Sequence, residues 1–238
     1  MRGEVMRMKN ILCFGDSNTF GVDPSGGRHP WHVRWPGRLQ FMLGGEYHVI
    51  EEGQGGRTTV WDDPLEPILS PGRNGAKALP IALASHRPLD MVILMLGTND
   101  CKLTYNVTPA VIAKGIETLC RMIVSFDYRG AAVPKILIIS PVYILDGVEN
   151  GPFISFDEKA PALSRQLASH FAKVARDNGC LFMDAAKCAH ASLIDCLHMD
   201  AASHIALARG VAEVVRDYFM MPDSEEVRAH WYNQLGRC

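Results

Sequence analysis

The sequence predicts a three-layer α/β fold in which a five-stranded parallel sheet lies between two layers of helices. Three observations lead to this fold class. Five short apolar runs are spaced along the chain, helical patterns lie between them, and the 238 residues fit one domain of ordinary size. Strands that alternate with helices form parallel sheets that are covered on both faces.

The five runs are the predicted strands. Each has four to six residues with β-branched or aromatic side chains, which is typical of strands buried on both faces. They cover residues 11–14, 48–51, 91–96, 136–140 and 181–184.

The clearest predicted helix follows the third strand. Thr108 is its expected N-cap and Pro109 suits its first position, where a missing N–H costs nothing. An apolar stripe at helical spacing then predicts which face is buried. The stripe comprises Val111, Ile112, Ile116, Leu119, Met122 and Ile123.

Two further helices are predicted nearer the C-terminus. One precedes the fifth strand and ends in a left-handed C-cap at Asn178-Gly179. Asp200 is expected to cap the other, which runs to about residue 219. The stripe of the first comprises Leu163, Leu167, Phe171, Val174 and Ala175.

Two stretches lack periodicity: residues 61–80, which hold four prolines, and residues 141–161. Long irregular connections in a compact domain are usually functional loops or covers, and loops after parallel strands line the ligand site. We expect a single domain over residues 1–221. Residues 222–238 are expected to form a C-terminal extension that packs on the body or on a neighbouring subunit.

Composition restricts the function classes. The formal net charge of -2 gives no reason to expect nucleic acid or an anionic membrane as a partner. Seven cysteines are odd in number and form no CxxC motif, which indicates reduced thiols. No apolar stretch approaches the roughly 18 residues of a membrane span, so we expect a cytoplasmic protein.

A serine, an aspartate and a histidine occur where such a fold can bring them together. Ser17 follows the first strand, in Phe14-Gly15-Asp16-Ser17, and Asp195 and His198 lie in one late turn. A serine hydroxyl becomes a strong nucleophile when a base removes its proton, and a carboxylate can orient an imidazole base. Each residue alone is more often structural. Together they predict a hydrolase or acyltransferase that needs no metal or organic cofactor.

His204 is the alternative base. His198 is preferred because Asp195 lies three residues before it, whereas Asp200, four residues before His204, is better used as a helix cap.

Two other positions can stabilise a developing oxyanion. Gly56 lies in a glycine-rich turn after the second strand, and Asn99 lies in Gly97-Thr98-Asn99-Asp100 after the third. A glycine lets its backbone N–H approach a reacting oxygen, and an asparagine amide is a neutral donor. We expect an oxyanion hole formed by Ser17, Gly56 and Asn99. Gly53 and Gly55 are alternatives to Gly56.

Six residues are candidates for the substrate pocket, although packing in the core or a lid is the alternative for most of them. Asp16 is expected to shape the turn rather than to catalyse. The candidates are Asp16, Trp35, Lys102, Tyr143, Phe153 and Phe156.

In order, these motifs resemble those of the SGNH hydrolases, also called the GDSL esterase/lipase family. The resemblance covers residues 9–219 and implies a flavodoxin-like SGNH hydrolase fold, with Ser17, Asp195 and His198 as the catalytic triad. Within the family the chain is most similar to the bacterial arylesterase/acyltransferase branch. Some members of that branch assemble into closed oligomers, so the resemblance implies a homo-oligomer. The segments that carry this likeness are residues 11–17, 33–35, 49–53, 57–59, 62–64 and 95–100.

The sequence departs from the family pattern in three places, one of which is the tail beyond about residue 219, which extends past the usual end of the family. It reads GDSN instead of GDSL, so that Asn18 follows the nucleophile. Phe20 and Val22 stand where the acyl-transferring members carry tryptophans.

The resemblance implies a serine esterase that hydrolyses short acyl esters of small molecules, in some members with acyl transfer to alcohols. A carbohydrate O-deacetylase is the first alternative, and a lysophospholipase or thioesterase is the second. A flavodoxin-like binding module is the non-enzymatic alternative, although no GxGxxG or Walker-type loop is present. An inactive structural relative is the remaining possibility.

Overall fold

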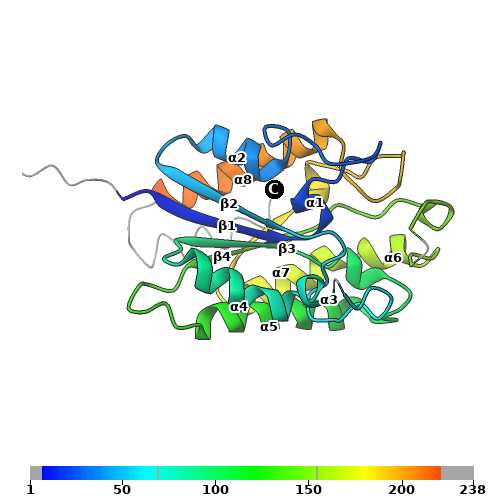
Figure 1. Cartoon of the computed structure of the whole chain (residues 1–238), viewed down its shortest axis with the longest axis horizontal. Coiled ribbons are helices and arrows are strands. Elements are labelled where there is room, and N and C mark those ends of the chain that lie inside the picture. Colours follow the sequence, from blue (N-terminus) through cyan, green and yellow to red (C-terminus); the bar gives the residue numbers. More distant parts are fainter. Residues whose placement is uncertain (1–6, 69, 154, 221–238) are drawn as a thin grey trace, which may run out of the picture.

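A computed structural model describes residues 7–68, 70–153 and 155–220 of the chain. Five parallel strands form one sheet in the order β2-β1-β3-β4-β5. Helices cover both faces of this sheet (Figure 1), so the predicted three-layer α/β fold is confirmed. The expected extension, residues 222–238, lies outside the described residues.

The five predicted runs are the five strands. They are β1 (Lys9–Gly15), β2 (Tyr47–Gly53), β3 (Met91–Met95), β4 (Lys135–Ser140) and β5 (Leu181–Asp184). The central strands are buried on both faces, as expected. That expectation is wrong for β2 and β5, which are only partly buried because each lies at an edge of the sheet.

Alternate residues of the strands face two separate cores. On one face, Ile11, Cys13 and Ile93 pack against α2 (Trp35–Leu43) and α8 (Ala201–Met220). On the other, Leu12 and Phe14 pack beneath α4 (Gly75–His86), α5 (Pro109–Ser125) and α7 (Leu167–Asp177). Figure 1 shows these two groups of helices above and below the sheet.

The predicted caps are present in the structure. The Thr108 side chain accepts a hydrogen bond from the Val111 N–H, and the Asp200 side chain accepts one from the Ser203 N–H. Gly179 is left-handed (φ 63°), and the Cys180 N–H donates to the Ala175 carbonyl, as in a Schellman motif.

Two details of the helical predictions are wrong. Val111 is exposed, because it lies in the first turn of α5 on the side away from the sheet. The stripe from Leu163 to Ala175 belongs to two helices, α6 (Ala160–Ser164) and α7, since the chain changes direction at Arg165 and Gln166.

Residues 61–80 are less irregular than predicted. They contain α3 (Ser70–Arg73) and the start of α4, which holds Pro80 in its interior. Asn74 caps α4 by accepting hydrogen bonds from the Ala76 and Lys77 N–H groups. The short remaining elements are α1 (Ser17–Phe20) and three 3₁₀ helices: η1 (Asn99–Cys101), η2 (Val148–Asn150) and η3 (Ala185–Lys187).

The carboxyl ends of three strands meet at one edge of the sheet. Gly15 of β1 is in register with Gly53 of β2 and with Met95 of β3. The chain leaves these positions towards Ser17, Gly56 and Asn99, so the segments predicted to hold functional residues are neighbours. No helix in the described part of the chain is long and apolar enough to span a membrane. The expected homo-oligomer stays a prediction.

The Phe171 side chain of α7 packs near the carboxyl edge of the sheet, so removing it shows how much the stability of the fold depends on this helical layer. Its ring is fully buried, and its Cζ would come within 3.0 Å of a Cβ built on Gly97, just before Asn99. We expect Phe171→Ala to lower the free energy of unfolding by about 3–5 kcal/mol, because the surroundings cannot fill the cavity.

The matched control is Phe41→Ala, because Phe41 is 72% exposed. This change should cost less than about 1 kcal/mol. Urea unfolding of both variants measures the difference. Equal losses would show that the Phe171 ring does not support the fold.

Candidate active site

Ser17 is the first residue of α1, directly after β1. Asp16 caps this short helix by accepting a hydrogen bond from the Asn18 N–H at 2.9 Å. The turn presents the Ser17 hydroxyl at the carboxyl end of the sheet, and Ser17 itself is 6% exposed.

A chain of hydrogen bonds joins Ser17, His198 and Asp195. The Ser17 Oγ lies 2.9 Å from His198 Nε2, and His198 Nδ1 lies 2.6 Å from an Asp195 carboxylate oxygen. The other oxygen of Asp195 accepts the backbone N–H groups of Leu197 and His198. Cys196 between them takes a left-handed conformation (φ 59°), which lets the carboxylate and the imidazole face each other.

Electrostatics favours an ionised Asp195. Burial alone would raise its pKa, but hydrogen bonds from the His198 ring and from two backbone N–H groups lower the pKa below its ordinary value. An ionised carboxylate at Nδ1 fixes a proton on that nitrogen, and Nε2 is then free to accept the proton of Ser17.

Asn18 ties the serine to the histidine turn. Its side-chain oxygen accepts the Met199 N–H at 2.9 Å, and its amide donates to the Leu197 carbonyl at 3.3 Å. These two bonds hold the backbone on both sides of His198. The departure from GDSL to GDSN therefore has a structural function that the sequence analysis missed. Only its position beside the nucleophile gave a signal.

Gly56 and Asn99 both line the cavity that contains Ser17. Gly56 has φ 78°, a conformation that side chains disfavour. The Asn99 amide is held by a hydrogen bond to the Arg57 carbonyl at 3.1 Å. Of the two alternatives to Gly56, Gly53 packs against α1, where a Cβ would lie 2.1 Å from the Phe20 nitrogen, and it is not among the residues that line the cavity. Gly55 also lines the cavity.

Arg57 holds these loops together, a role that the sequence analysis did not assign. Its buried guanidinium donates to the carbonyls of Gly15, Glu52 and Gly72, and lies 4.3 Å from the centre of the Phe14 ring. Burial lowers the pKa of Arg57 to about 10 although Glu52 opposes this.

A buried carboxylate fixes the next turn of the same loop. Asp100 accepts hydrogen bonds from the Thr59 N–H at 3.0 Å and from the Thr59 hydroxyl. Burial raises the pKa of Asp100 to about 7, and these bonds oppose the rise. Asp100 thus connects η1, which carries Asn99, to the loop that carries Gly56.

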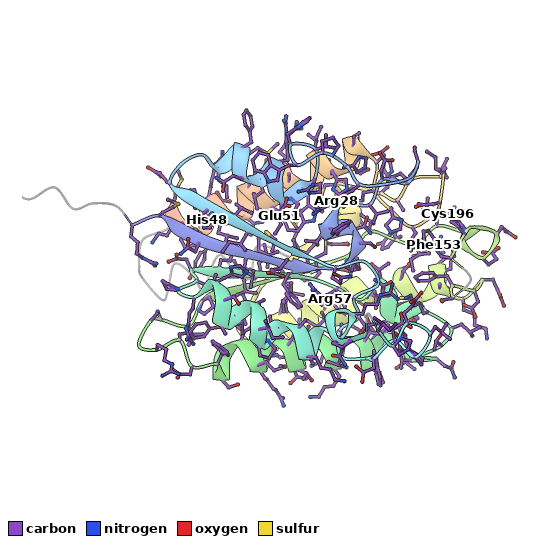
Figure 2. The ribbon with its side chains drawn as sticks, in the orientation of Figure 1. Arg28, His48, Glu51, Arg57, Phe153 and Cys196 are labelled. Atoms are coloured by element: carbon purple, nitrogen blue, oxygen red, sulfur yellow. The ribbon has the colours of Figure 1, made fainter. Side chains whose placement is uncertain are left out.

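The cavity at this site has a volume of about 360 Å³. One wall is apolar, with Phe153 in edge-on contact with the His198 ring at 5.3 Å between centroids. Figure 2 shows Phe153 at the same end of the molecule as Cys196. The other residues that line the cavity are Val22, Asp63, Leu65, Glu66, Arg73, Lys102, Ser155, Phe156 and Leu197.

Three of the six predicted pocket residues line this cavity: Lys102, Phe153 and Phe156. The prediction is wrong for Asp16 and Trp35, which are fully buried. Asp16 faces the turn that it caps, and burial raises its pKa to about 6. Trp35 begins α2 and packs in the core.

Tyr143, the remaining candidate, is not among the lining residues. Asp63, Arg73 and Glu66 were missed because they lie in residues 61–80, where periodicity gave no orientation.

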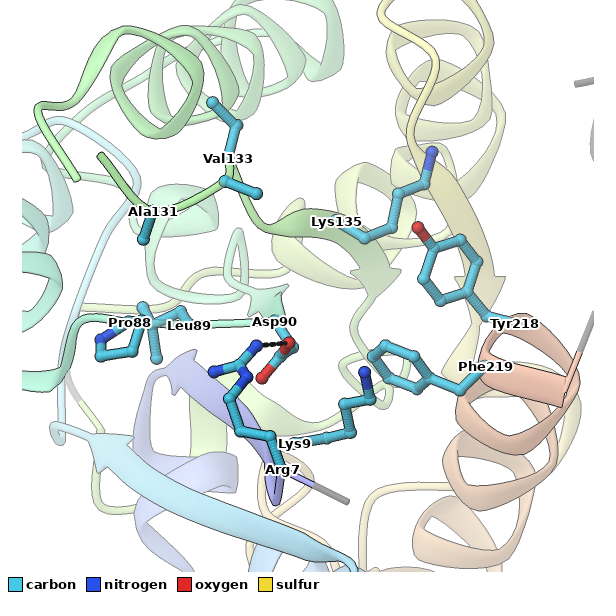
Figure 3. Close-up of a pocket in the computed structure, with 11 residues that line it drawn as sticks. Arg7, Lys9, Pro88, Leu89, Asp90, Ala131, Val133, Lys135, Tyr218 and Phe219 are labelled. Atoms are coloured by element: carbon cyan, nitrogen blue, oxygen red, sulfur yellow. Dashed lines mark hydrogen bonds and ion pairs between the residues drawn. The ribbon is translucent and has the colours of Figure 1, made fainter. Parts of the chain in front are cut away.

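A larger cavity, of about 660 Å³, lies at the opposite ends of the strands (Figure 3). Its charged groups already contact neighbours: Arg7 pairs with Asp90, and the Lys9 ammonium lies 5.4 Å from the centre of the Phe219 ring. Among the described lining residues there is no serine, cysteine or histidine. The described lining of this cavity therefore lacks a serine–histidine pair like that of Ser17 and His198.

His204 is excluded as the base. It is fully buried, and its Nδ1 accepts the Trp35 N–H at 3.2 Å. Burial, together with the neighbouring His29, lowers the pKa of His204 to about 3. The ring is a neutral acceptor that joins α8 to α2.

Comparisons with known proteins place the chain among similar sequences and structures. The chain matches the GDSL-like Lipase/Acylhydrolase family over residues 13–205. The structure of a carbohydrate acetylesterase family member from Sinorhizobium meliloti is 37% identical, with a TM-score of 0.83, and the match covers 90% of this chain and 100% of that one.

Two other solved structures are similar. Est24, a carbohydrate acetylesterase from Sinorhizobium meliloti, is 34% identical, with a TM-score of 0.81 and coverage of 89% and 100%. The native M. Smegmatis aryl esterase is 37% identical, with a TM-score of 0.80 and coverage of 88% and 99%. No curated protein sequence matches the chain.

The neutral state of His204 predicts a pH dependence of stability. The unfolded chain binds a proton at this ring below pH 6.5, whereas the folded chain does so only near pH 3, so acid favours unfolding. Between pH 7 and pH 5 this residue alone should remove about 2 kcal/mol from the free energy of unfolding.

His204→Asn keeps an acceptor for the Trp35 N–H but cannot titrate. Its free energy of unfolding should therefore fall less than that of the wild type between these two pH values. Urea unfolding at pH 7 and at pH 5 gives this fall for each protein. Comparing the two falls removes any cost of the substitution that does not depend on pH. An equal fall in the free energy of unfolding for the wild type and for His204→Asn would contradict a buried neutral His204.

Proposed function

The chain belongs to the GDSL-like lipase/acylhydrolase family, the SGNH hydrolases, and we propose that it is a serine esterase for short-chain acyl esters. The observation that carries the proposal is the hydrogen-bonded series Ser17–His198–Asp195 at the wall of a cavity. A serine in this arrangement can attack an ester carbonyl, because the base that takes its proton is already in contact.

In the first step, the Ser17 Oγ forms a bond to the carbonyl carbon and its proton passes to His198 Nε2. Asp195 stabilises the imidazolium that results. The oxyanion is bound by the backbone N–H groups of Ser17 and Gly56 and by the Asn99 amide. The carbon–oxygen bond to the alcohol then breaks, and the alcohol leaves with the proton from His198.

The second step releases the acyl group. Water gives a proton to His198 and attacks the acyl-serine, and the carboxylic acid leaves as Ser17 regains its proton. An alcohol in place of water would complete an acyl transfer. No proton acceptor other than His198 is required in either step.

The size of the cavity favours small esters. A volume of about 360 Å³ is near the lower end for ligand pockets, which span about 300–1,000 Å³. Phe153 and Leu197 line the cavity beside His198, and this apolar wall suits a small acyl group.

A carbohydrate O-deacetylase is the second candidate function. It is favoured by the likeness to the two carbohydrate acetylesterases from Sinorhizobium meliloti. Both candidates use the same hydrolytic chemistry and differ in the alcohol. Acetate release from acetylated sugars, compared with phenyl acetate, separates them.

The first test is hydrolysis of p-nitrophenyl acetate, butyrate and octanoate. We expect the acetate to be the best of the three, and Ser17→Ala or His198→Ala to lower kcat by about 10⁴-fold or more, because nucleophile and base act as a unit. A fluorophosphonate should label the wild type but not Ser17→Ala.

His204→Asn is the matched histidine control and should keep most of the activity. Full activity in folded His198→Ala would contradict the assignment of the base. Labelling of Ser17→Ala would show that the nucleophile lies elsewhere.

Asn18 provides a second test. Asn18→Leu restores the GDSL pattern but removes both hydrogen bonds to the histidine turn. We expect kcat to fall by about 10–100-fold with little change in KM, because a misplaced base affects the reaction more than binding. Asn18→Asp keeps the acceptor for the Met199 N–H and should lose less. Unchanged kcat in folded Asn18→Leu would show that these bonds do not position His198.

A further inference from the structure

Lys102 is a mostly buried cation beside the reacting groups. It follows η1, three residues after Asn99, and its side chain is only 12% exposed. It lines the cavity that contains Ser17 and His198. Its ammonium group forms a long ion pair with Asp63, whose nearest carboxylate oxygen is 3.6 Å away, so at most one of its three N–H donors is used there.

A second cation shares the same carboxylate. Arg73 Nη1 lies 2.7 Å from the Asp63 oxygen that also faces Lys102. The Arg73 guanidinium lies against Gly56, where its Nε would come within 2.8 Å of an added Cβ. Arg73 and Asp63 are 17% and 6% exposed, so all three charges are largely removed from water.

The buried charges of this wall do not balance. In the lining, Lys102 and Arg73 carry two positive charges and Asp63 carries one negative charge. Behind the lining, the buried Asp100 also acts on Lys102, but burial raises the pKa of Asp100 to about 7, so its negative charge is only partial near neutral pH. Glu66, the other carboxylate of the lining, is exposed, so water screens it. Burial lowers the pKa of Lys102, which the Asp63 carboxylate opposes. An excess buried cation is costly unless an anion is bound near it.

We propose that Lys102, supported by Arg73, binds a carboxylate group on the substrate, and that the natural substrate is an ester of a small carboxylate-bearing molecule. This proposal rests on the esterase function proposed above. A singly charged carboxylate matches the single excess positive charge. A doubly charged phosphate would bring a second negative charge close to the Asp63 carboxylate, and no further excess positive charge of the lining would offset it.

The ammonium group is suited to this recognition. Lys102 has three donors and a flexible stem, so it can meet a carboxylate at the cavity wall while the ester carbonyl lies at Gly56 and Asn99. A hydrogen bond between charged groups contributes about 1.5–3 kcal/mol, which corresponds to a preference of about 10–100-fold.

The test compares anionic esters with neutral isosteres. One pair, 3-acetoxybenzoate and 3-acetoxybenzamide, places the carboxylate on the alcohol. The other, monoethyl succinate and ethyl succinamate, places it on the acyl group. In at least one pair we expect kcat/KM of the wild type to favour the anion by about tenfold or more, and the preference to weaken with added NaCl.

Lys102→Met should bring this ratio close to 1, while Lys102→Arg, which keeps the charge, should retain most of it. Lys114→Met is the matched control, because Lys114 is an exposed lysine on α5 and should leave the ratio unchanged. Urea unfolding checks that each variant is folded. A wild-type ratio near 1 in both pairs, or a ratio that Lys102→Met does not change, would overturn the proposal.

Binding without turnover separates this proposal from the esterase function. Calorimetry with Ser17→Ala should show that 3-acetoxybenzoate or monoethyl succinate binds about tenfold more tightly than its amide. Equal binding in both pairs would overturn the carboxylate site even if p-nitrophenyl acetate is hydrolysed. Preferential binding would support the site even if the esterase function were wrong.

Discussion

The register of the three strands β2, β1 and β3 is the constraint on which the site depends. Because Gly15, Gly53 and Met95 lie in line, the chain leaves the sheet at one edge from three neighbouring points. Parallel strands place such ends together without any contact between the loops themselves. Arg57 then joins the loops, because one buried guanidinium donates to carbonyls of three separate segments. The nucleophile and the expected oxyanion donors are therefore positioned by the sheet first and by hydrogen bonds second.

Local sequence signals were sufficient where a single segment determines the structure. The strands were found from apolar runs, and the caps at Thr108 and Asp200 from residue type, since each depends on neighbours within a few positions. Helix α4 was missed because Pro80 normally interrupts a helix, whereas here the cap at Asn74 and burial of Leu79 and Leu83 outweigh the lost backbone bond. Periodicity also failed at the two edge strands, because burial there depends on what lies beside the sheet.

The same distinction applies to the site. Ser17 and Asn99 could be predicted to lie close together because each is part of a specific motif, and Asp195 and His198 because a carboxylate and an imidazole complement the serine. Asn18, Arg57 and Arg73 could not, because their partners are far away in the sequence: Asn18 contacts Met199, and Arg57 contacts Gly15. Trp35 was predicted as a pocket residue from its aromatic side chain, but its position depends on its contact with α8, which is distant in the sequence. Its backbone N–H pairs with His204, which places the indole in the core.

The polar groups around Ser17 differ in how completely they are paired. Asp195 accepts three hydrogen bonds, Asp100 is bound by Thr59, and Asn99 is held by the Arg57 carbonyl. Groups fixed in this way keep their geometry when a substrate binds, which is what transition-state stabilisation requires. Lys102 is held less firmly, because its ammonium lies 3.6 Å from the nearest carboxylate oxygen. An ammonium group has three donors, so those that this long ion pair does not use are available to a ligand, and a hydrogen bond there adds binding energy. The rigid groups therefore suit the reaction, and Lys102 suits selection among substrates.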